Sequence, residues 1–99
     1  MYTISVAPTF TRRPQDVTAV EGQTIQFICR ATGHPRPTFS WTKDLEQIGL
    51  DPRLTDHGDG ILTVRNVQAS DRGDYQCYAS NSVQTISATA RLSVRSEFI

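Results

Sequence analysis

The sequence predicts an all-β protein in which two sheets pack face to face. Apolar and polar residues alternate with a period of two in several segments, as in strands that have one buried face. No segment of useful length shows the period of an amphipathic helix, so no helix longer than a turn is expected. The 99 residues are enough for one domain and too few for two. A single two-sheet domain is therefore expected.

A spacing around the two cysteines carries a family resemblance. Tyr75 stands two residues before Cys77, and the only tryptophan, Trp41, follows Cys29 by twelve positions. The residues that carry the resemblance are Cys29, Trp41, Asp71, Gly73, Tyr75 and Cys77. They resemble the core and tyrosine corner of an I-set immunoglobulin-like domain, a Greek-key sandwich. The resemblance implies that a Cys29–Cys77 disulfide joins the sheets, that Trp41 packs on it, and that Tyr75 bonds back to the backbone.

The same resemblance implies an ion pair at the bottom of the sandwich. In relatives of this fold, an arginine near the start of the strand after the central loop pairs with the aspartate of the corner. Arg53 is the residue best placed to meet Asp71 in this way. If the pair is partly buried, removing one partner would cost more than the usual value for a surface pair, which is below about 1 kcal/mol.

The first half of the chain predicts four strands. The segment that begins at Pro8 resembles the first strand of the family, with Phe10 inward, and Pro14 interrupts it because proline has no backbone donor. Residues 16–20 form its second half, and Glu21-Gly22 supplies a turn. The next two strands are residues 23–31 and 38–43. Their expected inward residues are Ile25, Phe27, Cys29, Ala31, Phe39 and Trp41.

The second half predicts a short central loop and three longer strands. Twenty residues separate Trp41 from Leu62, which leaves room for at most one short extra strand. Asp59-Gly60 is a hairpin signal before a strand over residues 61–67. Strands over residues 75–80 and 85–95 follow. The loop residues expected to cap the core are Leu45, Ile48, Leu50 and Leu54, and the expected inward residues of the last three strands are Leu62, Val64, Val67, Tyr75, Cys77, Ala79, Ala88, Ala90, Leu92 and Val94.

Charge and cysteine content restrict the function and the compartment. Ten basic residues balance ten acidic ones, which argues against binding to nucleic acid or to a membrane surface through a strong positive field. No apolar run approaches the roughly 20 residues of a membrane span, so no direct membrane insertion is expected. A disulfide would place the domain in the extracellular space or at the cell surface. Residues 8–95 are expected to be the domain, with 1–7 and 96–99 as linker or residues added for expression.

Two regions are candidate binding surfaces. The loop Gly33-His34-Pro35-Arg36-Pro37 is similar to loops of I-set domains in neural adhesion receptors, receptor tyrosine phosphatases and matrix proteins. It would carry His34 and Arg36 at an exposed tip. The second region is an outer sheet face with Thr42, Tyr78 and Arg91, a composition suited to protein contacts. A sulfated glycosaminoglycan is a further expected partner, through Arg12, Arg13, Arg30, Arg36, Arg91 and Arg95.

Three other motifs are weighed against simpler structural explanations. The tripeptide Arg72-Gly73-Asp74 matches an integrin-recognition motif, but a tight corner would present it poorly. The segment Asp56-His57-Gly58-Asp59-Gly60 is rich in oxygen ligands yet lacks the regular spacing of a calcium loop. No zinc spacing is present, and no serine, histidine and acid recur in a catalytic setting. The sequence therefore predicts no enzyme activity, no metal site and no cofactor.

The favoured function is a non-catalytic protein-recognition module of a multidomain cell-surface or matrix protein, acting in adhesion or receptor–ligand recognition. Its partners would be another protein, homophilic or heterophilic, and neighbouring domains of its own chain. Two alternatives stay open. One is an intracellular sarcomeric or cytoskeletal spacer, since intracellular relatives of this fold can carry unpaired core cysteines. The other is the ligand-binding domain of a signalling receptor.

Overall fold

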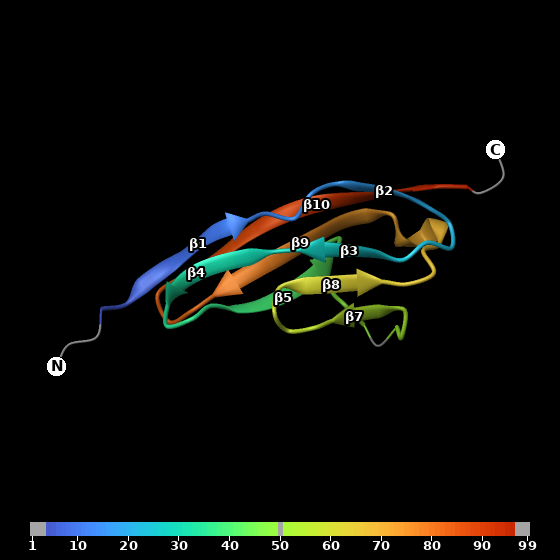
Figure 1. Cartoon of the computed structure of the whole chain (residues 1–99). Helices are drawn as coiled ribbons and strands as arrows, with labels where there is room; N and C mark the ends of the chain where they lie inside the picture. Colours follow the sequence, from blue (N-terminus) through green and yellow to red (C-terminus); the bar gives the residue numbers. More distant parts are fainter. Residues whose placement is uncertain (1–3, 50, 97–99) are drawn as a thin grey trace.

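The computed structural model describes residues 4–49 and 51–96, and its regular secondary structure is almost entirely strand (Figure 1). In the first half of the chain these are β1 (Val6–Arg12), β2 (Val17–Val20), β3 (Ile25–Ile28), β4 (Arg30–His34), β5 (Thr38–Lys43) and β6 (Glu46–Gln47). The second half holds β7 (Leu54–Asp56), β8 (Ile61–Val64), the 3₁₀ turn η1 (Ala69–Asp71), β9 (Gly73–Ser80) and β10 (Thr85–Arg95). The expectation of an all-β chain with no helix beyond a turn is confirmed.

The strands form two packed layers. One layer is a five-stranded sheet in the order β2-β10-β9-β5-β6, with β2 parallel to β10 and the other neighbours antiparallel. In the other layer β1 pairs with β4, and β3 pairs with β8, which pairs with β7. Only Cys29 separates β3 from β4, so these two small sheets continue into one another (Figure 1). The predicted two-sheet sandwich is confirmed.

The alternating segments form strands because one side of each can be buried. Phe27, Cys29 and Trp41 are at most 3% exposed, whereas their neighbours in the sequence are half-buried or exposed. The same alternation runs along β9 and β10, whose buried residues face the other layer. The core thus lies between the layers. Its largest fully buried side chains are Tyr75, Phe27, Leu62, Leu92, Val64, Val67, Cys29 and Cys77.

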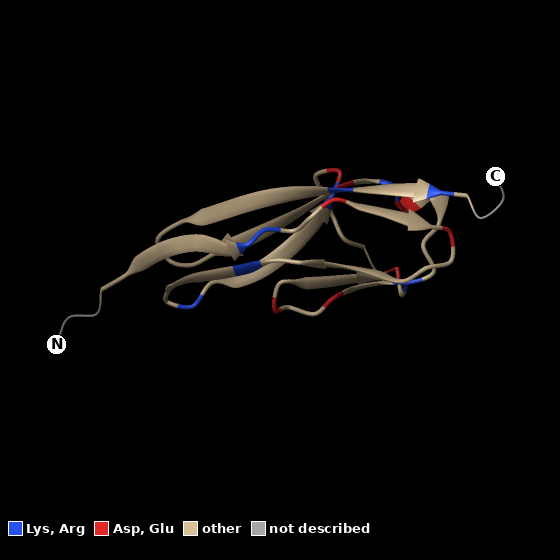
Figure 2. Cartoon of the chain, turned by 45° about the horizontal axis from the view of Figure 1, so that its top comes forward, with Lys and Arg blue, Asp and Glu red and all other residues tan. Residues whose placement is uncertain are grey.

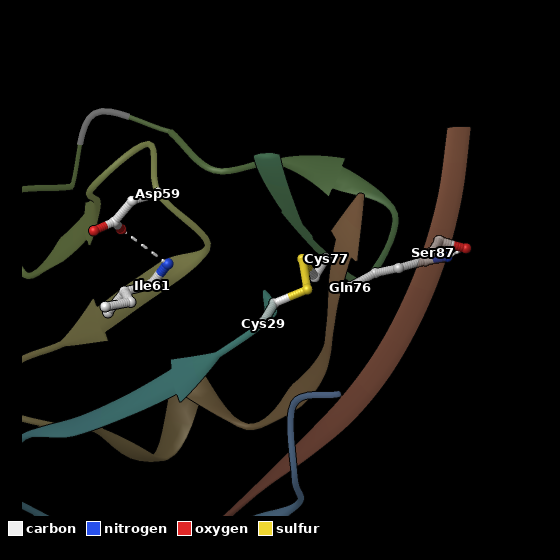
Figure 3. Close-up of a disulfide and its surroundings, with 6 residues drawn as sticks. All are labelled: Cys29, Asp59, Ile61, Gln76, Cys77 and Ser87. Atoms are coloured by element: carbon white, nitrogen blue, oxygen red, sulfur yellow. Dashed lines mark hydrogen bonds between the residues drawn. A yellow bond between two sulfur atoms is a disulfide. The ribbon is translucent and has the colours of Figure 1, made fainter. Parts of the chain in front are cut away.

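Two local breaks fix how the strands are joined. Pro14 separates β1 from β2, and the chain changes layers there, because β1 pairs with β4 and β2 pairs with β10. Gly60 has a positive φ of 92°, and a Cβ at this position would collide with the backbone oxygen of Cys29. The Asp59 carboxylate accepts a hydrogen bond from the Ile61 amide across the same turn (Figure 3). Only glycine allows the backbone at residue 60 to approach the backbone of Cys29 this closely.

The loop residues that were expected to cap the core differ in how deeply they are buried. Ile48 and Leu54 are partly buried against the core, as expected. The expectation for Leu45 is wrong, because its side chain is 79% exposed. Asp44 and Leu45 both have positive φ and form the two-residue turn between β5 and β6, which directs Leu45 into solvent. Leu50 lies outside the described residues.

Candidate functional site

The disulfide joins the two layers at the centre of the sandwich. Cys29 lies between β3 and β4, Cys77 lies on β9, and their sulfurs are bonded, as the spacing predicts (Figure 3). Both residues are fully buried, and their Cα atoms are 6.6 Å apart. The bond closes a sequence separation of 48 residues. It therefore constrains the unfolded chain strongly while both half-cystines stay shielded from solvent.

Aromatic side chains surround this bond in a continuous cluster. Trp41 is the cross-strand neighbour of Cys77 and is 3% exposed. The rings of Phe27 and Tyr75 stack at 5.0 Å between centroids, and the Phe27 and Trp41 centroids are 6.1 Å apart. Leu62 lies opposite Phe27 on β8 and is fully buried. These contacts hold the two layers in one relative position.

The corner before β9 holds the predicted ion pair. The Arg53 guanidinium donates to both carboxylate oxygens of Asp71, at 2.7 and 2.9 Å. The Gln68 amide donates a third bond to Asp71, at 2.7 Å. The Asp71 side chain is 5% exposed and that of Arg53 is 22% exposed. Burial alone would raise the pKa of Asp71, but the hydrogen bonds from Arg53 and Gln68 outweigh it and hold this pKa below its ordinary value.

Tyr75 closes the same corner from inside the core. Its hydroxyl donates a 2.6 Å hydrogen bond to the backbone oxygen of Asp71, which is the expected bond back to the backbone. Burial raises the pKa of the Tyr75 hydroxyl, and the negative charge of Asp71 adds to the effect. The hydroxyl therefore stays protonated and continues to donate at neutral pH.

Replacing Tyr75 by phenylalanine removes this donor without changing the ring. We expect Tyr75→Phe to lower the free energy of unfolding by about 1–3 kcal/mol, because a buried carbonyl loses its hydrogen bond. Tyr78→Phe is the matched control, since the Tyr78 hydroxyl is only partly buried and accepts a longer 3.3 Å bond from Thr42. Its effect should stay within about 0.5 kcal/mol. Urea unfolding of both variants measures the difference, and equal losses would contradict the role given to Tyr75.

The Arg72-Gly73-Asp74 tripeptide belongs to the corner and to β9. Gly73 begins the strand with a φ of 148°, and a Cβ there would meet the Asp44 carboxylate. The Asp74 carboxylate accepts a 3.1 Å bond from Arg91, and its amide donates to Asp44 at 2.9 Å. Arg72 is exposed. The aspartate is thus held in a strand by two neighbours, unlike a projecting integrin-binding loop.

The outer face of the five-stranded sheet carries three of the candidate binding residues. In the register, Thr42 lies beside Gln76, Tyr78 beside Ser40, and Arg91 beside Asp74. Tyr78 lies in a surface hollow of about 590 Å³ that Thr42 also lines. The other residues lining this hollow are Ser40, Trp41, Gln47, Ile48, Gly49, Leu54, Asp56, Ser80 and Thr85. This lining combines apolar side chains with several hydroxyl groups, a composition that suits contact with a protein side chain.

The structure does not bring the five candidate binding residues into one site. Arg91 lines a separate hollow, and the four-residue step from Asp74 to Tyr78 corresponds to about 13 Å along β9. His34 ends β4 and Arg36 lies in the loop that follows it; both are exposed, and the peptide bond between His34 and Pro35 is cis. They belong to a different region of the molecule from Arg91.

Sequence reasoning missed the residue that holds this loop in place. The Asn81 amide donates to the backbone oxygens of Val6 and Pro35, at 2.7 and 3.1 Å. Its side-chain oxygen accepts from the Val83 amide at 2.9 Å. Asn81 therefore ties β1 and the 33–37 loop to the β9–β10 hairpin. The only sequence signal was an asparagine at a hairpin position, which does not specify such contacts.

The loop at residues 56–60, which is rich in oxygen ligands, is held by hydrogen bonds to nearby residues. His57 shares a 2.9 Å hydrogen bond with the Thr63 hydroxyl, and Asp56 accepts from the Gly58 amide within the loop. Over residues 4–49 and 51–96, no three His, Cys, Asp or Glu side chains gather in a way that would hold a metal ion. The same ranges include no helix with the length and apolarity needed to cross a bilayer.

The comparisons with known proteins agree with this geometry. The chain is 43% identical over 89 residues to peroxidasin homolog of Mus musculus, covering 89% of this chain and 6% of that protein. It is 36% identical to contactin-2 of Rattus norvegicus, covering 92% of this chain and 9% of that protein. The solved structure of titin domain M7 superimposes with a TM-score of 0.85 at 32% identity, covering 95% of this chain and 99% of that one.

These matches concern a single domain, because the chain spans less than a tenth of the two relatives' length. The family model of the immunoglobulin I-set domain matches residues 8–94, which includes the disulfide, the aromatic cluster and the corner. Domains of this kind occur in multidomain proteins. The chain belongs to the immunoglobulin I-set domain family.

Proposed function

We propose that this domain is a non-catalytic protein-recognition module of a multidomain cell-surface or matrix protein, acting in adhesion or receptor–ligand recognition. The observation that carries the proposal is the hollow around Tyr78 on the outer face of the five-stranded sheet. A half-buried tyrosine surrounded by hydroxyl groups offers a large apolar contact and a polar end. The disulfide-linked layers hold this face rigid, which lowers the ordering cost of binding.

The open edge of β5 adds to this surface. β6 has only two residues and pairs with β5 only at Thr42 and Lys43. The remaining length of β5, from Thr38 to Trp41, has no neighbouring strand on that side among the described residues. The hollow around Tyr78 lies along this unpaired part. A partner can therefore reach both the side chains and the strand edge.

The extracellular assignment rests on the disulfide and on the relatives. A buried disulfide persists in oxidising compartments, and contactin-2 is an adhesion-related relative. The similarity to titin domain M7 favours a second candidate function, an intracellular spacer module. The redox state of Cys29 and Cys77 in the native protein separates the two candidates.

A binding assay tests the recognition function. A streptavidin tetramer of the domain, biotinylated beyond residue 96, is applied to beads coated with the same domain and to intact cells before and after protease treatment. We expect protease-sensitive binding that Tyr78→Ala weakens at least about tenfold, since a central aromatic anchor carries a large share of such affinity. Thr24→Ala, an exposed change on a strand-free segment, is the control and should bind as the wild type does.

Two outcomes would contradict the proposal. In the first, the wild-type tetramer binds neither the coated beads nor any protease-sensitive component of the cells. In the second, the Tyr78→Ala tetramer binds as tightly as the Thr24→Ala tetramer does. Circular dichroism of Tyr78→Ala must show the wild-type strand content, so that lost binding is not lost folding.

A further inference from the structure

Two arginines lie directly opposite each other on neighbouring strands. Arg12 of β1 and Arg30 of β4 are register partners in an antiparallel pair. Figure 2 shows the basic end of β1 beside the basic start of β4. The register shifts between Phe10 and Arg12, so Arg12 shares the outer face with Arg30 although Phe10 packs on the core. A bulge of this kind re-aims a side chain, and no simple alternation in the sequence would show it.

Arg13 extends the cluster. Its guanidinium carbon lies 5.2 Å from the centroid of the Phe10 ring, which holds the side chain over the sheet. Arg12, Arg13 and Arg30 are all exposed. Among the described residues, the ion pairs involve Arg53 and Arg91, and none involves these three arginines. The cluster therefore places three cations that no ion pair neutralises on a chain whose formal net charge is zero, with Asp16 as the carboxylate that lines the adjoining hollow.

This arrangement costs stability in the free domain. Like charges placed directly opposite in an antiparallel pair are destabilising. A bound anion would remove the repulsion, so binding and stability are coupled at this position. Guanidinium groups suit such a ligand because they donate paired hydrogen bonds to planar or tetrahedral oxyanions.

A hollow beside the cluster indicates the class of ligand. It has a volume of about 140 Å³ and is lined by Arg12, Arg13, Gln15, Asp16, Val17, Gln26 and Ile28. Ile28, a half-buried apolar residue on the outer side of β3, gives it an apolar patch. Asp16 and the two glutamines can accept hydrogen bonds from hydroxyl groups, which a bare inorganic anion lacks. Arginines, amides, one carboxylate and an apolar patch together suit a sugar that carries anionic substituents.

We propose that Arg12, Arg13 and Arg30, with the hollow between β1 and β3, form a binding site for the sulfated sugars of a glycosaminoglycan. The proposal rests on the extracellular location given above, since such chains occur at cell surfaces and in the matrix. Arg12 and Arg30 lie on the layer that contains β1 and β4, and the hollow reaches β2 only at Val17, whereas Tyr78 lies on β9 and lines a different hollow. The two sites can therefore be tested independently.

Charge reversal at Arg12 separates binding from folding. In Arg12→Glu, the cross-strand repulsion becomes an attraction to Arg30, so we expect the Tm to rise by about 1–5 °C. The same variant should lose heparin hexasaccharide affinity at least about tenfold in 150 mM NaCl, measured by biolayer interferometry. A residue with only a structural role would not shift these two measurements in opposite directions.

Arg65→Glu is the matched control, because Arg65 is exposed, is outside the hollow and has no acidic partner among the described residues. It should change hexasaccharide affinity less than about twofold. The proposal is overturned if Arg12→Glu and Arg65→Glu weaken binding equally. It is also overturned if completely desulfated heparin, polyglutamate or a DNA oligonucleotide binds as tightly as the hexasaccharide. Tyr78→Ala should bind the hexasaccharide normally, so failure of the protein-recognition function leaves this result intact.

Discussion

Replacing both half-cystines by alanine, in Cys29→Ala/Cys77→Ala, is expected to lower the free energy of unfolding by roughly 4 kcal/mol. The loop-closure entropy released over a separation of 48 residues gives this magnitude. It is a large part of the 5–15 kcal/mol, roughly, that stabilises a typical domain. Both residues are fully buried in the core between the layers, so the missing sulfurs add a packing loss.

Urea unfolding followed by Trp41 fluorescence measures this loss. The slope of the free energy against urea should also rise, because an unfolded chain without the cross-link exposes more surface. Treatment with a phosphine reductant should destabilise the wild type toward the level of the double variant and leave the variant unchanged. A loss below about 1 kcal/mol would mean that the disulfide contributes little to this fold.

Arg53→Ala is expected to lower the free energy of unfolding by about 3 kcal/mol, since it leaves the buried Asp71 carboxylate without its charged partner. The variant also loses the bonds from Arg53 to the Asn66 backbone and to Asp51, at 3.1 and 3.0 Å. Arg91→Ala is the matched control. The Arg91 and Asp74 side chains are 68% and 49% exposed, so breaking that pair should cost less than about 1 kcal/mol.

The pH dependence of unfolding gives this prediction a second test. The pKa of Asp71 is lowered in the folded protein, so the folded state binds this proton less readily than the unfolded state does. The stabilisation from Asp71 is therefore present at neutral pH and is lost as the pH falls below about 4. In Arg53→Ala the carboxylate keeps its burial but loses its main partner. The difference between wild type and Arg53→Ala should shrink in acid, and an unchanged difference would contradict the pairing.

The residues around the disulfide were predictable from sequence because each has a geometric requirement at a fixed spacing. A cysteine pair, a tryptophan twelve residues after the first cysteine, and a tyrosine two residues before the second leave few arrangements that bury them all. Arg53 was predictable only through the resemblance. The alternation of apolar and polar residues then indicated which side of the strands faces the core.

Other features depend on backbone geometry that the side-chain pattern does not encode. Leu45 looked like a core residue because it is apolar, but the turn at Asp44 and Leu45 places it in solvent. The opposition of Arg12 and Arg30 arises from a bulge in β1. The contacts of Asn81 with β1 and the 33–37 loop join segments up to 75 residues apart. Each of these needs the tertiary arrangement before it can be seen.

The candidate binding residues show the same limit. Tyr78 and Arg91 were correctly expected on one face, yet they line different hollows. Strand alternation gives the face of a residue, but hollows depend on where a short edge strand such as β6 stops. A binding surface is thus less predictable than the core that supports it.

Peptide mapping without reduction tests the central claim most directly. The full-length protein is isolated from its native cells, its free thiols are alkylated at once, and the digest is analysed by mass spectrometry. We expect one linked peptide pair that contains Cys29 and Cys77, with neither residue alkylated. Recovery of both residues as alkylated single peptides would contradict a disulfide-stabilised extracellular module and would favour the intracellular spacer.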